Sequence, residues 1–282
     1  MSDNFSIRIM TRQELDLVID WAAAEGWNPG LHDAHSFYAV DPKGFYIGLL
    51  NNQPVASIAV VKYSREFGFL GLYIVKPECR GRGYGFQTWT AGLAHLSDCV
   101  IGLDGVISQQ VNYKRSGFTL LYRNIRFQGP GGGNATVDKG IVPLWSIPLN
   151  ELCEFDRRYF PADRSTFLKN WVNQSHSWAL AIRENNALAA YGVMRTCRKG
   201  YKIGPLFAQS SEQAERLFNA FKTRVSQNDD LFLDVPEPNQ TGLALAEKYQ
   251  LKKCFETARM YRGTAPALPV SKIFGVTTFE LG

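Results

Sequence analysis

Residues 69–95, FLGLYIVKPECRGRGYGFQTWTAGLAH, constrain the fold of this chain more than any other stretch. The apolar run before Pro77 is typical of a buried strand. From Phe86 to Leu96 apolar side chains recur every three or four residues, which predicts one face of a helix. Between them lies a glycine-rich turn at residues 80–85, so the sequence predicts a strand that leads through this turn into a helix.

The turn at residues 80–85 is suited to binding a phosphate group. Gly81, Gly83 and Gly85 permit positive φ angles and let a ligand approach the backbone closely. The first N–H groups of the following helix lack partners inside the helix and lie at the positive end of its dipole. Arg80 and Arg82 add positive charge. Taken alone, the same turn would also fit a solvated surface loop.

The motif differs from the common nucleotide-binding loops. No Gly-Lys-Ser/Thr follows it, and the spacing G-x-G-x-x-G is absent. It resembles motif A of the GNAT acetyltransferases, Arg/Gln-x-x-Gly-x-Gly/Ala, through Arg80, Gly83 and Gly85. The resemblance implies that the backbone of Ile74 and Val75 pairs with the pantetheine arm of acetyl-CoA. It also implies that the pyrophosphate is held by Arg80, Gly81, Arg82, Gly83, Tyr84 and Gly85.

Composition indicates a globular protein of the cytoplasm. The 282 residues, of which 45% are hydrophobic, suffice for one large or two ordinary domains. Aliphatic stretches fall far short of the roughly 20 residues that a membrane span needs, and the first residues lack a signal-peptide pattern. Five scattered cysteines without a C-x-x-C pair fit free thiols in a reducing compartment. Cys79, inside the turn, is expected to be packed rather than nucleophilic.

Charge argues against nucleic-acid binding, and the spacing of the histidines argues against a metal site. The formal net charge is +5, and no dense basic run is present. The four histidines form no set with metal-ligand spacing. We therefore expect no nucleic-acid partner, no membrane partner and no metal.

The second half of the chain repeats the first in weakened form. Asn186 echoes Asn52 at a distance of 134 positions, and Gly204 echoes Gly71 at 133. Repeated similarity at nearly one offset indicates duplication of a whole domain. Together with the resemblance, it predicts an α/β fold of two tandem GNAT-like domains, each a mixed, mostly antiparallel sheet flanked by helices. We expect a first domain at 1–129, a glycine-rich linker at 130–140 and a second domain at 141–282.

The second copy lacks the turn. Where the first copy has residues 80–85, the second has residues 209–215 without any glycine, and Glu212 and Glu215 would repel a pyrophosphate. Ser210 and Gln213 are typical of a helix cap. We expect this domain to be degenerate, with the fold kept and the cofactor site lost.

Local patterns predict several further elements. Thr11 and Glu14 form a capping box before a helix, and residues 45–50 and 55–63 form a hairpin around an Asn-Asn turn. A strand at 100–103, a short helix at 108–115 and a strand at 119–127 complete the first unit. In the second unit we expect a strand at 141–144 and a helix at 149–159.

Two residues are candidates for the chemistry of acetyl transfer, which needs an uncharged amine and a proton for the leaving thiolate. Tyr113 precedes Gly117-Phe118 as in the Tyr-x-x-x-Gly-Phe of the family, where the tyrosine commonly donates to the coenzyme sulfur; a packed tyrosine is the alternative. Asp104 is the best remaining acid, because the central strand has Gly71 and Tyr73 where many relatives carry a glutamate. A turn at Asp104-Gly105 and water-relayed deprotonation remain open alternatives.

The expected function is acetyl-CoA-dependent N-acetylation of a small-molecule primary amine, by direct attack in a ternary complex, in a monomer or homodimer. The alternative is a non-catalytic sensor of acyl-CoA. The ending at 273–282 and Phe160-Pro161-x-x-Arg164 resemble the two-domain, YitH-type branch of the family. We expect the second domain to supply a wall of the acceptor pocket, from Trp178, Tyr191, Asp234, Phe274 and Glu280.

Overall fold

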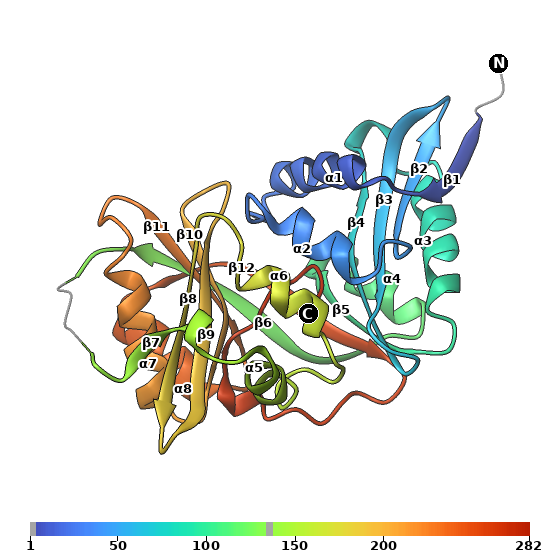
Figure 1. Cartoon of the computed structure of the whole chain (residues 1–282). Helices are drawn as coiled ribbons and strands as arrows, with labels where there is room; N and C mark the ends of the chain where they lie inside the picture. The colour runs from blue at the N-terminus through green and yellow to red at the C-terminus, as the bar shows by residue number, and fades with distance from the viewer. Residues whose placement is uncertain (1–3, 134–137) are drawn as a thin grey trace.

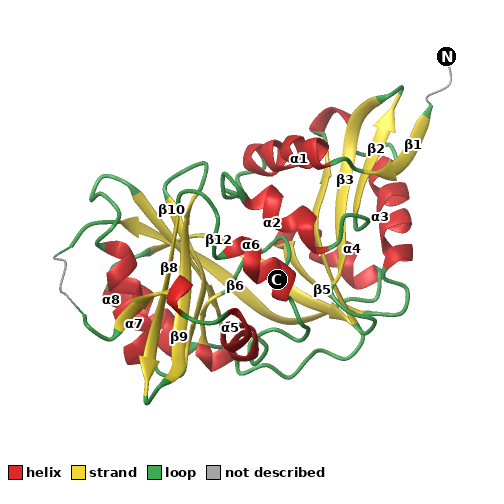
Figure 2. Cartoon of the chain, viewed as in Figure 1, coloured by secondary structure: helices red, strands yellow, loops and turns green. Residues whose placement is uncertain are grey.

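The computed structural model describes residues 4–133 and 138–282 (Figure 1; Figure 2). The first half of the chain gives, in order, β1 (Phe5–Ile9), α1 (Arg12–Ala24), α2 (Asp33–Val40), β2 (Phe45–Leu50), β3 (Gln53–Lys62), β4 (Phe67–Val75), α3 (Tyr84–His95), β5 (Val100–Val106), α4 (Gln110–Arg115) and β6 (Thr119–Pro130). The second half gives β7 (Ile141–Pro143), α5 (Leu149–Asp156), α6 (Ser165–Trp171), β8 (Ser177–Glu184), β9 (Ala187–Thr196), β10 (Tyr201–Ala208), α7 (Ser211–Lys222), β11 (Asp230–Pro236), α8 (Gln240–Lys248), β12 (Lys252–Arg262) and β13 (Ile273–Gly275). No helix of the described residues is long and apolar enough to cross a bilayer.

All strands of the described residues belong to one sheet, in the order β1-β2-β3-β4-β5-β12-β6-β11-β10-β9-β8-β7, with β13 added beside β10. The pairs β4–β5 and β10–β11 are parallel, and every other described pair is antiparallel. The sheet is therefore mixed and mostly antiparallel, and helices flank it, which confirms the predicted fold class.

The two halves exchange a strand. β12, from the second half, lies between β5 and β6, and β6 lies beside β11 of the second half. In Figure 1 these two long strands cross between the blue half and the orange half. The halves are thus repeats in sequence, but each half's part of the common sheet includes a strand that pairs with the other half. Local patterns could not predict this exchange, because strand pairing between distant segments leaves no periodicity in either segment.

The sequence predicted a glycine-rich linker at 130–140, but residues 130–133 belong to the packed structure. β6 continues through Pro130, which pairs with Asp230. The N–H groups of Gly131 and Gly132 donate to second-half carbonyls at 3.0 Å and 2.8 Å. Residues 131–133 therefore pack against the second half, and residues 134–137 lie outside the described residues.

The predicted start of the chain is confirmed. Thr11 caps α1 and Glu14 completes the capping box. Arg8 also donates to both oxygens of Glu14, at 2.8 Å and 2.6 Å. The 45–50 strand, the turn and the following strand form the hairpin β2–β3. The helix expected at 149–159 ends earlier, at Asp156, whose carboxylate accepts hydrogen bonds from Nε and Nη2 of Arg164.

A shared core fixes the halves relative to each other. One cluster of buried apolar side chains joins α1 and α2 to α5, α6 and β9. Phe37 and Trp171 stack across the junction with ring centroids 6.0 Å apart. Arg195 pairs with Asp33 at 2.8 Å, also across the junction, and both are fully buried. Any pocket at this junction is consequently part of one packed body.

β4 separates from β5 at its carboxyl end. Their pairing runs from Phe67 with Val100 to Leu70 with Leu103 and then stops, although both strands continue. A bulge follows in β4, where Leu72 has φ of +47° and its carbonyl accepts a hydrogen bond from Ser57 Oγ at 2.8 Å. Bulges of this kind redirect the side chains beyond them. A gap therefore opens between β4 and β5, next to the turn at residues 80–85.

In the second half the corresponding gap is filled by the chain itself. β10 and β11 pair only from Tyr201 to Ile203, and β13 then pairs with β10 at Leu206 and Phe207. A Cβ added to Gly204, the echo of Gly71, would lie 2.5 Å from the carbonyl oxygen of Thr277. Residues 273–277 thus occupy the space that is open in the first half.

Candidate active site

The turn presents the amino end of α3 to the gap. Gly83 is the N-cap in the left-handed region, with φ of +82°, and Gly81 has φ of +76°. No side chain caps α3. In α7, the equivalent helix of the second half, Ser210 and Gln213 form the predicted capping box, which satisfies these N–H groups internally. The first half alone therefore offers a helix start without a side-chain cap.

The arginines of the turn are held differently from each other. Arg80 Nε donates to the carbonyl of Val75 at 2.9 Å, and its guanidinium pairs with Glu25 at the end of α1. Arg82 lies 5.1 Å from the ring centroid of Tyr84. That ring is buried and stacks on Phe5 at 4.6 Å. Tyr84 can consequently contribute to a ligand site through its backbone, whereas Arg80 keeps its charge at the gap.

A cavity of about 560 Å³ extends from the turn along the gap between β4 and β5. Its lining includes most of the positions expected to contact the cofactor: Ile74, Val75, Arg80, Gly81, Gly83, Gly85 and Tyr113. Arg82 and Tyr84 do not line it. The lining also includes Glu25, Trp27, Val106, Gln109 and Phe255, which the sequence did not single out. We call this space the donor cavity.

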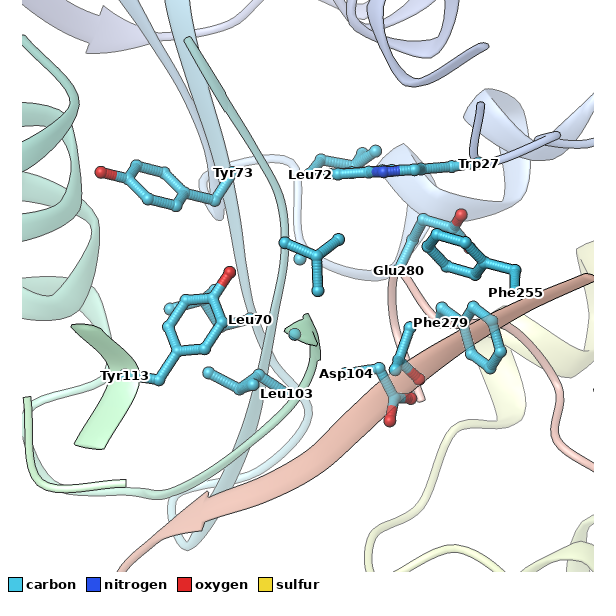
Figure 3. A pocket seen from close by; sticks show the side chains of 14 residues that line it. Trp27, Leu70, Leu72, Tyr73, Leu103, Asp104, Tyr113, Phe255, Phe279 and Glu280 are labelled. Atoms are coloured by element: carbon cyan, nitrogen blue, oxygen red, sulfur yellow. The ribbon is translucent and has the colours of Figure 1, made fainter. Parts of the chain in front are cut away.

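A second, narrow cavity of about 30 Å³ adjoins the donor cavity and shares Trp27, Tyr73, Val106, Tyr113 and Phe255 with it. Its lining further includes Gly71, Asp104, Thr257, Phe279 and Glu280. Figure 3 shows Tyr73 and Tyr113 on one side, and Glu280, Phe255, Phe279 and Asp104 on the other. We call it the acceptor cavity. Both cavities are built from both halves of the chain, because Phe255 and Glu280 come from the second.

Tyr113 lies where the two cavities meet. α4 carries it, and its ring stacks on Trp89 with centroids 5.7 Å apart. Burial raises the pKa of Tyr113 well above its usual range, and the nearby Tyr73 adds to the shift. Its hydroxyl has no hydrogen-bond partner in the part of the chain that the structure describes. A phenol kept neutral in this way can donate its proton to a developing anion.

Asp104 lies in β5 and not in the turn that its sequence allowed. Arg259 donates to both of its carboxylate oxygens, at 2.8 Å and 2.6 Å, and Asn124 donates at 2.7 Å. Burial raises the pKa of Asp104, and the charge of Arg259 opposes that shift. The Asp104 carboxylate is thus held in the wall of the acceptor cavity with both oxygens already engaged by Arg259 and Asn124.

Of the second-half residues expected in the acceptor wall, Glu280 lines the cavity. The other four serve the fold. Trp178 packs on Tyr201, Tyr191 donates to Asp156, Asp234 pairs with Arg126, and Phe274 lies in the second-half core. The expectation for these four was wrong, because each faces the interior of the second half or the junction rather than the cavity.

The described residues include no group of three or more His, Cys, Asp or Glu side chains that could hold a metal ion. The fold and the two joined cavities are those of a duplicated acyl-transfer domain with one open cofactor gap. Sequence profiles agree with this class: the Acetyltransferase (GNAT) family matches residues 12–116, and an Acetyltransferase (GNAT) domain matches residues 152–275.

Known relatives are similar to this chain over nearly its whole length. The holothin acyltransferase of Pseudoalteromonas sp. (strain SANK 73390) is 31% identical over 270 residues, covering 96% of this chain and 92% of the relative. A candidate acetyltransferase of Pyrococcus horikoshii has a similar structure, with TM-score 0.84 and 24% identity over 99% of this chain and 96% of that one. A tandem GNAT protein from the clavulanic acid biosynthesis pathway gives TM-score 0.62 with 11% identity, over 93% and 100%. This chain belongs to the GNAT acyltransferases, as a tandem member.

Proposed function

We propose that the chain transfers the acetyl group of acetyl-CoA to the primary amine of a small molecule, by direct attack in a ternary complex. The observation that carries the proposal is the pair of joined cavities with Tyr113 on their shared wall. The two substrates can therefore be bound at the same time, one in each cavity, with their reacting groups close to Tyr113. The amine then reaches the thioester without a covalent intermediate on the protein.

In this proposal the first half, residues 1–129, binds the donor. The turn at residues 80–85 holds the pyrophosphate through backbone N–H groups and Arg80. The unpaired edge of β4 at Ile74 and Val75 pairs with the pantetheine arm, since β5 has left that edge. Residues 141–282 bind no donor, because β13 fills the equivalent gap and a capping box closes the start of α7.

Tyr113 acts as the proton donor in the proposed reaction. The amine nitrogen attacks the carbonyl carbon of the thioester, a C–N bond forms, and the C–S bond breaks. The leaving thiolate takes the phenol proton, and the proton that the nitrogen loses restores the phenol through solvent. Because burial keeps the phenol neutral, the donor is protonated throughout the neutral pH range.

The acceptor is proposed to be a small, positively charged amine. Glu280 places a carboxylate without an ion-pair partner among the described residues at the acceptor cavity, and Trp27, Phe255 and Phe279 give the cavity aromatic walls that suit a cation. We assign Asp104 the role of a fixed charge rather than a base, since Arg259 and Asn124 occupy its oxygens. The name of the holothin acyltransferase supports a small-molecule acceptor. The free cysteines support action in a reducing compartment, the cytosol.

A thiol-release assay tests the proposal. The protein is given acetyl-CoA and a panel of primary amines, and free thiol and acetylated product are measured. We expect turnover with at least one amine, and a fall in kcat of about 100-fold or more in Tyr113→Phe with acetyl-CoA affinity unchanged. Tyr122→Phe is the matched control, because Tyr122 is a buried tyrosine of the same half that lines neither cavity. Binding of acetyl-CoA without turnover on any amine would refute catalysis and favour the sensor.

A further inference from the structure

We propose that Glu280 binds the ammonium group of the acceptor and takes its proton. The second half delivers this carboxylate into the active site of the first half through the closing segment, residues 276–282. The inference rests on the proposed function and adds to it the group that recognises the acceptor.

The closing segment packs directly on the central strand of the first half. A Cβ added to Gly71 would lie 2.0 Å from the carbonyl oxygen of Glu280 and 2.9 Å from its Cα. Nonbonded heavy atoms from other parts of the chain essentially never come within 3.0 Å of a real Cβ, so a glycine is needed at this position. The missing side chain of Gly71 is what allows Glu280 to reach the acceptor cavity.

Several contacts hold the closing segment in place before any substrate binds. β13, immediately before it, pairs with β10. Tyr63 donates to the carbonyl of Leu281 at 3.0 Å, and Arg164 Nη1 donates to that of Gly282 at 3.2 Å. Thr278 Oγ1 donates to Glu280 Oε2. The carboxylate is therefore preorganised, which lowers the entropy cost of binding and orienting a substrate.

Two polar groups, a carboxylate and a hydroxyl, line the same small space. Glu280 is 3% exposed, and its Oε2 accepts a hydrogen bond from Thr278 Oγ1. Thr257 is 2% exposed, and its Oγ1 is buried and has no hydrogen-bond partner among the described residues. Buried polar groups are normally hydrogen-bonded, so an unmade pair points to a ligand. A carboxylate and a hydroxyl together match a donor with several N–H groups, which is an ammonium.

The size of the acceptor cavity restricts what enters it. The acceptor cavity, about 30 Å³, is much smaller than the donor cavity of about 560 Å³. It therefore takes the amino end of the acceptor, and the rest of the acceptor extends into the donor cavity or displaces side chains at the shared wall.

The other charged groups around Glu280 form ion pairs with other carboxylates, although Nη1 of Arg195 is buried without a hydrogen-bond partner among the described residues. Arg259 is held by Asp104, Arg126 by Asp234 and Arg195 by Asp33. Arg126 and Arg195 still act on Glu280 through their charge, and Tyr113 faces the same cavity. Among the described residues Glu280 makes no ion pair of its own. An incoming ammonium would supply that pair at the point where the amine must lose its proton.

The proposed reaction conserves atoms, protons and charge. The ammonium of the bound acceptor gives one proton to the Glu280 carboxylate and becomes a neutral amine, which attacks the thioester. Tyr113 protonates the thiolate, and the nitrogen returns a proton to Tyr113 through solvent. The carboxylic acid of Glu280 releases its proton to solvent with the product. The sum is ammonium plus thioester giving amide, thiol and one proton.

The test compares an alkylamine with an arylamine of similar size, both measured with acetyl-CoA, in the wild-type chain and in Glu280→Gln. An alkylamine has a pKa near that of lysine, about 10.4, and is almost fully protonated at pH 7, whereas an arylamine is already neutral. We expect Glu280→Gln to lose about 100-fold or more in kcat/KM for the alkylamine and far less for the arylamine. Raising the pH toward the alkylamine pKa should recover the lost rate.

Matched variants separate this role from a structural one. Glu237→Gln changes an exposed glutamate of the second half and should leave both rates unchanged. Thr257→Val should raise the alkylamine KM about 10-fold, and Thr257→Ser should restore it. If Glu280→Gln fails to fold, Glu280→Asp withdraws the carboxylate by one methylene and should show the same selective loss to a smaller extent.

The outcomes distinguish the two proposals. Equal losses for both amines in Glu280→Gln, or no loss, would overturn the role of Glu280 while leaving acetyl transfer intact. No thiol release from the wild-type chain with either amine would defeat the proposed function, and this inference with it. A selective loss that high pH repairs would support both.

Discussion

Replacing Gly71 with alanine should move Glu280 and thereby slow acetylation of an alkylamine. The added Cβ would lie 2.0 Å from the Glu280 carbonyl oxygen, whereas ordinary contact begins near 3.4 Å. The closing segment must therefore shift by about 1.4 Å. Misplacement of a reacting group by about 1 Å can cost about 100-fold in rate. We expect kcat/KM for the alkylamine to fall by about that factor, with acetyl-CoA affinity nearly unchanged.

The free energy of unfolding of Gly71→Ala should fall as well, because the added methyl group presses against the packed closing segment. Overpacking of this kind costs about 1–3 kcal/mol, which lowers Tm by about 2–10 °C in a protein of this size. The rate is therefore measured at a temperature well below the transition, by thiol release, and Tm is measured in parallel by calorimetry.

Gly68→Ala is the matched control for Gly71→Ala. Gly68 lies on the same strand, and its added Cβ would lie 2.5 Å from Leu96 Cδ2, away from both cavities. The control should lose a similar amount of stability and keep its rate. A Gly71→Ala variant whose alkylamine kcat/KM stays within a factor of about two of wild type would refute the reasoning. So would equal losses of rate in the two variants.

Three further predictions follow from other parts of the structure. Gly83→Glu should weaken acetyl-CoA binding by about 100-fold or more, since it places a carboxylate and a Cβ at a left-handed N-cap. Titration calorimetry measures the affinity. Ser211→Glu, at the start of α7, is the control and should leave the affinity unchanged. The same titration of the wild-type chain should give one acetyl-CoA per chain, and two would contradict the filled gap at β13. Arg8 lowers the pKa of Glu14 from 4.5 to about 2, so this group stabilises the fold above pH 4.5 and the contribution is lost as pH falls toward 2. Glu14→Gln should thus cost about 1–2 kcal/mol at neutral pH and nothing near pH 2, as urea unfolding at several pH values would show; a cost independent of pH would contradict it.

The donor side of the site could be predicted from sequence because it is local. The turn at residues 80–85 carries its chemistry in consecutive residues. Six of the eight expected positions line the donor cavity, and Arg82 and Tyr84 do not: the six are Ile74, Val75, Arg80, Gly81, Gly83 and Gly85. The misleading case was Tyr84. Its ring turns toward Phe5 because helical periodicity places it on the buried face of α3.

The acceptor side depends on contacts between distant segments and could be predicted only in part. Glu280 and Gly71 are more than 200 positions apart in the sequence and touch in the structure. The strand exchange brings Phe255 and Thr257 of β12 beside β5, where they line the acceptor cavity. No local pattern contains this information. Asp104 was found from sequence, but its partner Arg259 belongs to the exchanged strand, so its engagement could not be foreseen.

The duplicated second half has a structural use in this account. It lost the turn, but its β13 fills its own cofactor gap and leads directly into the closing segment. Gly204 and Gly71, the paired glycines of the two copies, both make room for that segment. We therefore propose that the second half, without binding a donor itself, positions the carboxylate that recognises the acceptor.

The most direct test of the central claim is a crystal structure of the chain with coenzyme A and an unreactive amine analogue. We predict the pyrophosphate at residues 80–85, the pantetheine arm along Ile74 and Val75, the sulfur beside the Tyr113 hydroxyl and the amine against Glu280. A pyrophosphate at the start of α7, or an amine bound away from Glu280, would contradict the account.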